Sequence, residues 1–111
     1  MEKFNLKMIR TTTFEEVVFN FKINGINVDL TDYVIEMRVR KEYQGKIYLY
    51  FTSVANDGIT ITDAVNGDFK INQQNINIDS YNYIWDMKFT DGDGISKIYF
   101  GGEFLIENNV T

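Results

Sequence analysis

A chain of 111 residues with a net charge of −5 has room for one domain with a single hydrophobic core. The charge argues against nucleic acid as a partner, and the absence of Cys and His removes disulfides, thiol chemistry, the commonest metal ligand and the commonest general base. No apolar run reaches the roughly 20 residues of a membrane span, so we expect no membrane contact. An aromatic share of 15% favours strands over helices.

The first third of the chain predicts a strand followed by a tight turn. Residues 1–13 are polar and weakly patterned, which indicates a flexible arm or an edge strand ahead of a single β-sandwich domain over 14–111. From Phe14 to Ile23 apolar residues occupy alternate positions, as in a half-buried strand. Asn24-Gly25 then predicts a type I′ hairpin turn, and with no Pro in the chain the turns depend on Gly, Asn and Asp.

The middle of the chain contains the firmest predicted register. Residues 33–40 place apolar side chains on one face and three charged ones on the other, so a shift of one residue would bury those charges. Residues 47–52 form a predicted strand that is apolar on both faces, which indicates a central strand or one covered by a partner. Residues 59–62 and 69–71 predict two more strands, and residues 72–80 predict a loop with room for one helical turn.

The last third predicts the strand at the centre of the core. Residues 81–89 alternate around Trp85, which we expect to be buried between two sheets. The turn at 91–94 leads into a final strand, where Gly101-Gly102 permits a bulge. About eight short strands with frequent turns predict an all-β sandwich or a small barrel.

The acidic turn Asp91-Gly92-Asp93-Gly94 is the best candidate for a calcium site, because hard cations prefer several oxygen ligands held by a tight loop. A calcium loop that starts at Asp91 needs a bidentate Glu at its twelfth position, where Gly102 stands. A plain hairpin turn is therefore the favoured interpretation. We predict no metal and no cofactor.

Catalysis is not expected either. Glu36, Asp86 and Glu103 could supply a carboxylate pair for glycoside hydrolysis, but alternation places Glu36 and Asp86 on the outward faces of their strands. No His is present to activate a serine, and no glycine-rich phosphate loop occurs. The sequence therefore predicts that the protein is not an enzyme.

Three tyrosines are the candidate interface residues: Tyr48, Tyr50 and Tyr81. Alternation from 47 to 51 puts Tyr48 and Tyr50 on one face, and a two-layer core cannot bury both faces of that strand. Tyr81 begins the aromatic stripe that continues to Trp85, which is either a core strand with Tyr81 at its rim or a platform for stacking sugars. We expect an interface here, with a homo-oligomer as its simplest form.

Several short motifs resemble those of small bacteriophage virion proteins. They include a Val-Asp-Leu-Thr-x-Tyr corner, a strand with Met-x-x-Arg, a Tyr-x-Trp-Asp-Met strand, an Asp-Gly turn, and a closing Gly-x-Phe-x-Ile followed by Val-Thr. The pattern is similar to the N-terminal domain of phage upper baseplate proteins. The matching residues are Val28, Asp29, Leu30, Thr31, Tyr33, Met37, Arg40, Gly58, Ile59, Gly67, Tyr83, Trp85, Asp86, Met87, Asp93, Gly94, Gly102, Phe104, Ile106, Val110 and Thr111.

This resemblance implies an immunoglobulin-like antiparallel β-sandwich without catalysis. The expected function is that of a phage structural protein, a tail or baseplate subunit or adaptor acting through protein-protein contacts. Other virion proteins would be its partners, and it would be found in the virion, or in the host cytoplasm during assembly. The alternative is a carbohydrate-binding module for attachment to the host surface, which depends on exposed tyrosines.

Overall fold

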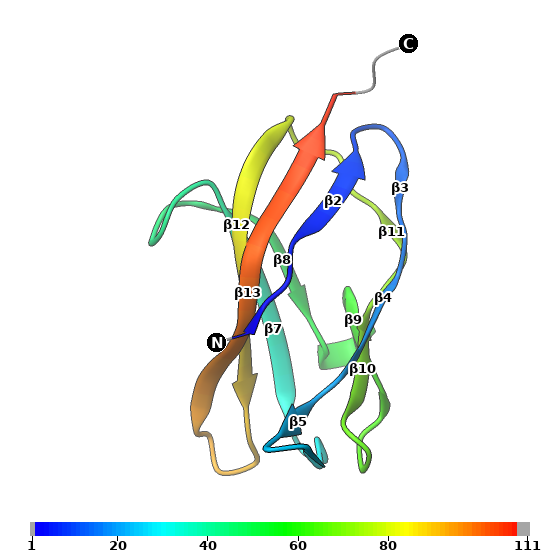
Figure 1. Cartoon of the computed structure of the whole chain (residues 1–111), viewed down its shortest axis with the longest axis vertical. Helices are drawn as coiled ribbons and strands as arrows, with labels where there is room; N and C mark the ends of the chain where they lie inside the picture. Colours follow the sequence, from blue (N-terminus) through cyan, green and yellow to red (C-terminus); the bar gives the residue numbers. More distant parts are fainter. Residues whose placement is uncertain (1, 109–111) are drawn as a thin grey trace.

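The computed structural model describes residues 2–108, and almost all of its regular structure is strand (Figure 1). Val110 and Thr111 of the motif pattern lie outside the described residues. None of the described residues belongs to a helix with the length and apolar character needed to cross a membrane. The elements are β1 (Glu2–Lys3), β2 (Leu6–Ile9), β3 (Thr13–Phe14), β4 (Val17–Asn20), β5 (Lys22–Ile23), β6 (Ile26–Asn27), β7 (Val34–Arg40), β8 (Ile47–Thr52), the 3-10 turn η1 (Val54–Asn56), β9 (Ile59–Asp63), β10 (Asp68–Ile71), β11 (Gln74–Asn75), β12 (Tyr81–Thr90) and β13 (Ser96–Glu107).

Two sheets face each other, which confirms the predicted antiparallel β-sandwich. The larger sheet has the order β1-β13-β12-β7-β8, with β2 also paired to β13, and the smaller sheet has the order β4-β10-β9. The short pairs β3–β11 and β5–β6 extend the second layer. Strands β1 and β2 pair with β13 in parallel, whereas the other pairings within the larger sheet are antiparallel.

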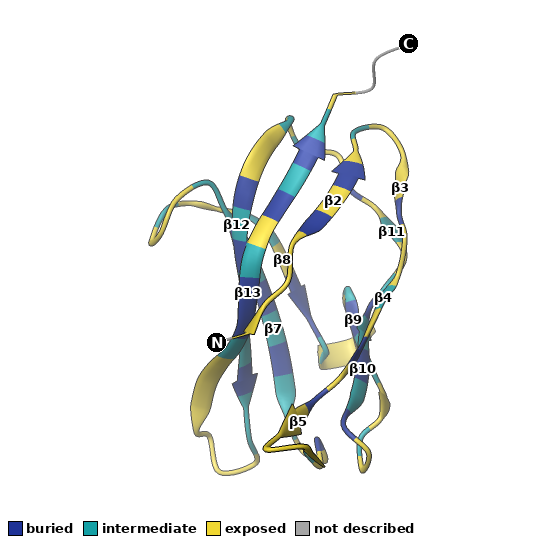
Figure 2. Cartoon of the chain, in the orientation of Figure 1, coloured by how far each residue is buried: buried dark blue, intermediate teal, exposed yellow. Residues whose placement is uncertain are grey.

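Side-chain alternation along β7 and β12 follows the predicted pattern (Figure 2). In β7, Ile35, Met37 and Val39 are fully buried, while the charged residues between them are only partly covered. Strand β12 is paired with β7 on one side and β13 on the other, so its inward residues lie at the centre of the core. A central strand with charges only on its outer face has one register that keeps those charges in water.

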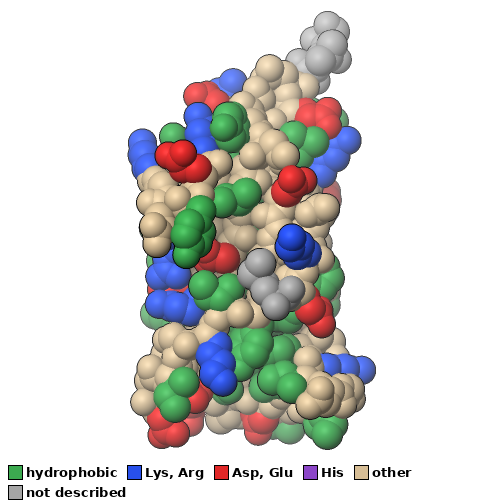
Figure 3. Space-filling view, turned by 60° about the vertical axis from the view of Figure 1, so that its left-hand side comes forward, with side chains coloured by type: hydrophobic (Ala, Val, Ile, Leu, Met, Phe, Trp, Pro, Cys, Tyr) green, Lys and Arg blue, Asp and Glu red, His purple; other side chains and the backbone are tan. Residues whose placement is uncertain are grey.

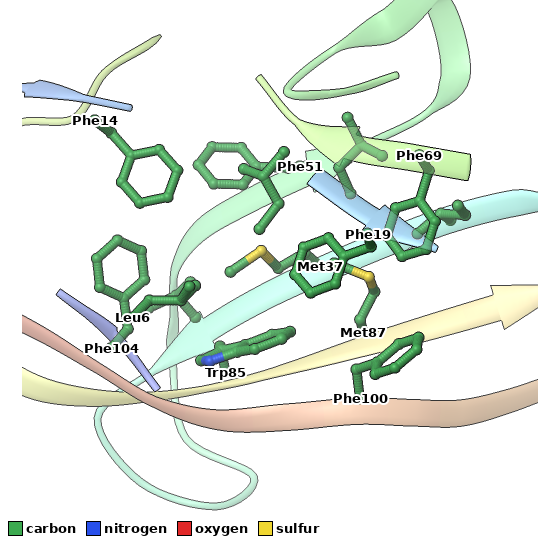
Figure 4. Packing of buried hydrophobic residues seen from close by; sticks show 14 of the residues in the cluster. Leu6, Phe14, Phe19, Met37, Phe51, Phe69, Trp85, Met87, Phe100 and Phe104 are labelled. Carbon is green, nitrogen blue, oxygen red and sulfur yellow. The ribbon is translucent and has the colours of Figure 1, made fainter. Parts of the chain in front are cut away.

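Trp85 is buried between the two sheets, as its place in the alternation predicts (Figure 4). Its side chain is 3% exposed, and its indole Nε1 donates a hydrogen bond to the main-chain oxygen of Phe4 at 2.9 Å. Around it the core is rich in aromatic rings, including the stacked pair Phe19 and Phe69, with ring centroids 5.0 Å apart. Such pairs add to the free energy gained from burying apolar area.

Two turns have the backbone geometry that their residues favour. Asn24 and Gly25 have φ values of 52° and 77° between β5 and β6, as a type I′ turn requires. The carboxylate of Asp91 accepts hydrogen bonds from the main-chain N–H groups of Asp93 and Ile95, at 2.9 and 3.0 Å. The prediction for residues 72–80 is wrong in one respect: they contain the short strand β11 and no helical turn, because Gln74 and Asn75 pair with β3.

Candidate functional site

Strand β8 is a free edge of the larger sheet. Its inner neighbour is β7, and no described strand pairs along its other side, although a single bridge joins Thr52 to Gly58 at its end. No residue from Ile47 to Thr52 is charged. Natural proteins usually protect such edges with charge, because unpaired N–H and C=O groups invite another strand.

The main chain of Tyr50 faces this free edge. Ser53 donates its N–H to Ile35 of β7 at 2.9 Å, whereas Thr52 donates in the opposite direction, to the oxygen of Asp57 at 2.7 Å. Successive N–H groups of a strand point to alternate sides, so the N–H of Phe51 points toward β7 and that of Tyr50 points away from it. The middle of β8 therefore offers main-chain hydrogen-bonding groups to a partner.

A β-bulge separates the two tyrosines that alternation had placed on one face. Leu49 pairs with Val39 and Ile47 pairs with Arg40, which leaves Tyr48 as the extra residue. The Tyr48 ring lies 5.6 Å from that of the buried Tyr83, while Tyr50 pairs with Arg38 on the charged outer face. The expectation that Tyr48 and Tyr50 share a face is wrong.

On its outer face the larger sheet has a network of neutralised charges beside Tyr50. Glu36 lies 3.3 Å from Arg38 and 3.5 Å from Lys88, and it accepts a hydrogen bond from the Tyr50 hydroxyl. That hydrogen bond is the largest cause of the lowered pKa of Glu36, and it also raises the pKa of Tyr50. Tyr50 is 46% exposed even so.

The other two predicted interface residues meet at one end of β8, with two lysines. We call Lys41, Lys46, Tyr48 and Tyr81 the Tyr-Lys cluster. The Lys41 ammonium lies 5.1 Å from the Tyr48 ring centroid and 4.7 Å from that of Tyr81, and the Lys46 ammonium lies 5.0 Å from Tyr48. Over the residues 2–108, the ion pairs within 4 Å include neither lysine. Sequence reasoning found the tyrosines but not the lysines, which the loop between β7 and β8 contributes.

A groove of about 590 Å³ lies on the outer face of β12 and β13. Its lining includes Tyr43, Ile84, Ile98 and Gly102, and Tyr43 is 83% exposed on the loop between β7 and β8. Figure 3, turned to bring the left-hand side of Figure 1 forward, shows hydrophobic side chains interspersed with charges of both signs. Asp86 also lines the groove, and its carboxylate lies 3.4 Å from the guanidinium of Arg40.

The carboxylates considered for catalysis lie on the outer face of the larger sheet, where Asp86 and Glu103 both line the groove. Glu36 and Asp86 each face a cation, and Glu103 lies on β13, opposite Ile84. The candidate calcium turn uses its Asp91 carboxylate to accept two main-chain hydrogen bonds. In the part of the chain that the structure describes, no three His, Cys, Asp or Glu residues gather where they could hold a metal.

The sequence matches no family model and no curated protein. Among solved structures, CopC from Methylosinus trichosporium OB3b is similar, with a TM-score of 0.51 and 13% identity, over 96% of this chain and 88% of that chain. At this identity the likeness is one of fold. The similar structure is not that of a phage protein, so the predicted phage family, the virion function with its host-attachment alternative, and the virion location are wrong.

The motif residues explain the mistaken resemblance. Many of them are buried in the core, among them Met37, Tyr83, Trp85 and Phe104. Others are turn glycines with positive φ, such as Gly58 and Gly67. Core and turn positions are constrained by the architecture of a sandwich, so a pattern made of them indicates the fold and not a lineage.

Proposed function

We propose that this chain is a non-enzymatic binding module that recruits another protein by strand addition at β8. The observation that carries the proposal is the free edge itself: from Ile47 to Phe51 it is uncharged, and it presents the N–H of Tyr50 outward. In strand addition, main-chain hydrogen bonds supply affinity, and side chains on alternate positions supply specificity.

The exposed side chains of β8 support this proposal. Ile47 and Tyr50 are 41% and 46% exposed, so a partner strand would cover apolar area on the outer face as well as main-chain groups. The neighbouring strand β7 instead has ion pairs on its outer face, within the strand and to β12. Exposed edge strands usually contain charged side chains that prevent pairing with another strand, but β8 has none in a chain whose net charge is −5.

The available side chains do not fit a transition-metal function. This chain has neither His nor Cys, which are common ligands of transition metals. Thioether sulfur is the remaining soft ligand, and within residues 2–108 the methionines Met8, Met37 and Met87 are all buried in the core. We therefore derive no transition-metal function from the likeness of fold.

The test is a titration with a synthetic peptide of residues 46–52, followed by NMR. Strand addition should protect the Tyr50 amide from hydrogen exchange and shift resonances along β8. The same peptide with the main-chain nitrogens of residues 47–51 methylated is the control, since neither of its edges can then donate ladder hydrogen bonds. Shifts confined to the groove of Tyr43, or equal binding of the methylated peptide, would refute strand addition at β8.

A further inference from the structure

We propose that the partner strand is β8 of a second copy, paired antiparallel so that Lys41 and Lys46 of each copy lie beside Asp57 of the other. This inference rests on the proposed function and names its partner and its register. It starts from the charges at the two ends of the free edge, which are of opposite sign.

The positive end is the Tyr-Lys cluster. Lys46 directly precedes β8 and Lys41 directly follows β7. Both ammonium groups lie within 5.1 Å of the Tyr48 ring centroid, so two positive charges lie beside one ring at this end of the strand. An aromatic ring compensates a cation only in part, so both ammonium groups would gain from an approaching carboxylate.

The negative end is the turn that follows β8. Asp57 is exposed, and its main-chain oxygen accepts the N–H of Thr52, which places the residue on the free side of the strand. Among the described residues, its carboxylate takes part in no ion pair within 4 Å. The same contact closes the edge at Thr52, so an added strand must end against this turn.

Antiparallel pairing of two identical edges brings the start of each strand to the end of the other. The free stretch from Ile47 to Phe51 would pair with its own copy, and Lys46 would then meet the turn of Asp57 at both ends of the interface. Parallel pairing would instead place lysine beside lysine. A two-fold interface of this kind is self-complementary, as a closed dimer requires.

Like the charges, two exposed apolar residues lie at opposite ends of the free edge. Ile47 at the start of β8 is 41% exposed, and Val54 in the turn after β8 is 57% exposed. Antiparallel pairing brings these two side chains to the same end of the interface, once from each copy. The opposite charges and the exposed apolar side chains therefore both favour antiparallel pairing of β8 with β8 of a second copy.

The experiment is a charge swap measured by sedimentation equilibrium at low and high salt. The wild-type chain should dimerise in a concentration-dependent way, and Lys46→Glu or Asp57→Lys should each weaken the dimer by about tenfold at low salt. The double variant should recover most of that loss. Asp93→Lys is the matched control, because it changes net charge equally in a turn far along the chain and should leave the dimer unchanged.

The possible outcomes test the antiparallel register, the second copy as partner, and strand addition itself. A double variant as weak as either single variant would overturn the register, and so would single variants that dimerise like the wild type. A wild-type chain that stays monomeric while the peptide of residues 46–52 still protects the Tyr50 amide would overturn the second copy and leave strand addition standing. Failure of both dimerisation and peptide binding would overturn the two proposals together.

Discussion

Gly102 is the position where one added methyl group should cost the most. Its φ of +154° is one that side chains rarely adopt, and a Cβ placed there would lie 2.1 Å from the main-chain oxygen of Phe4. That oxygen also accepts the hydrogen bond from the Trp85 indole. Gly102→Ala must therefore displace the chain between β1 and β2, and the displacement leaves a buried donor without its acceptor.

The cost has two parts. Holding an L residue at such a φ costs about 1–2 kcal/mol. Leaving the buried indole N–H of Trp85 without its acceptor costs about 1–3 kcal/mol more. We therefore expect Gly102→Ala to lower the free energy of unfolding by about 2–5 kcal/mol, a large fraction of the 5–15 kcal/mol that is typical of a folded protein.

Urea unfolding followed by Trp85 fluorescence measures this loss. Gly94→Ala is the control, because Gly94 also has a positive φ, +83°, but nothing lies within 4 Å of its added Cβ. It should lose only the conformational part, about 1–2 kcal/mol. Equal losses in the two variants would show that the approach of Phe4 does not require glycine at position 102.

Three further predictions concern the core, the charged face and the acidic turn. Trp85→Ala should lower the free energy of unfolding by about 3–5 kcal/mol, and an unchanged urea midpoint would contradict its burial. The pKa of Glu36 is lowered from 4.5, chiefly by the Tyr50 hydroxyl, so its stabilisation is present above that pH and is lost as the pH falls through the folded-state pKa. Glu36→Gln should therefore destabilise the protein more at pH 7 than at pH 3 in urea titrations, and equal losses at the two pH values would refute this. Thermal unfolding in EDTA and in millimolar calcium should coincide, since a calcium-dependent rise in the midpoint would reveal a site.

The elements that sequence reasoning placed well are those whose side chains alternate without interruption. In β7 and β12 the charges can occupy only one face, and Trp85 follows from that pattern. Asn24-Gly25 predicted its turn because few residues tolerate positive φ at both positions. These features depend on neighbours within a few residues, which a sequence displays directly.

The candidate site could be predicted only in part, because it depends on a bulge and on distant contacts. Nothing in the residues 47–52 signals that Tyr48 is the extra residue, since a bulge is set by pairing with β7. Lys41 and Tyr81 are far apart in the sequence and meet only in the folded chain. The free edge also required the strand order, which alternation does not give.

The pairing of β1 and β2 with β13 has a consequence for how the chain folds during synthesis. Glu2 lies opposite Phe100 and Leu6 opposite Phe104, so strands that are far apart in the sequence are paired. Leu6 and Met8 are buried by this pairing and must stay exposed on the nascent chain until β13 has left the ribosome. Contacts this distant in sequence form slowly. The larger sheet can be completed only after β13 has been translated. Until then Leu6 and Met8 form an exposed apolar segment to which a chaperone would bind.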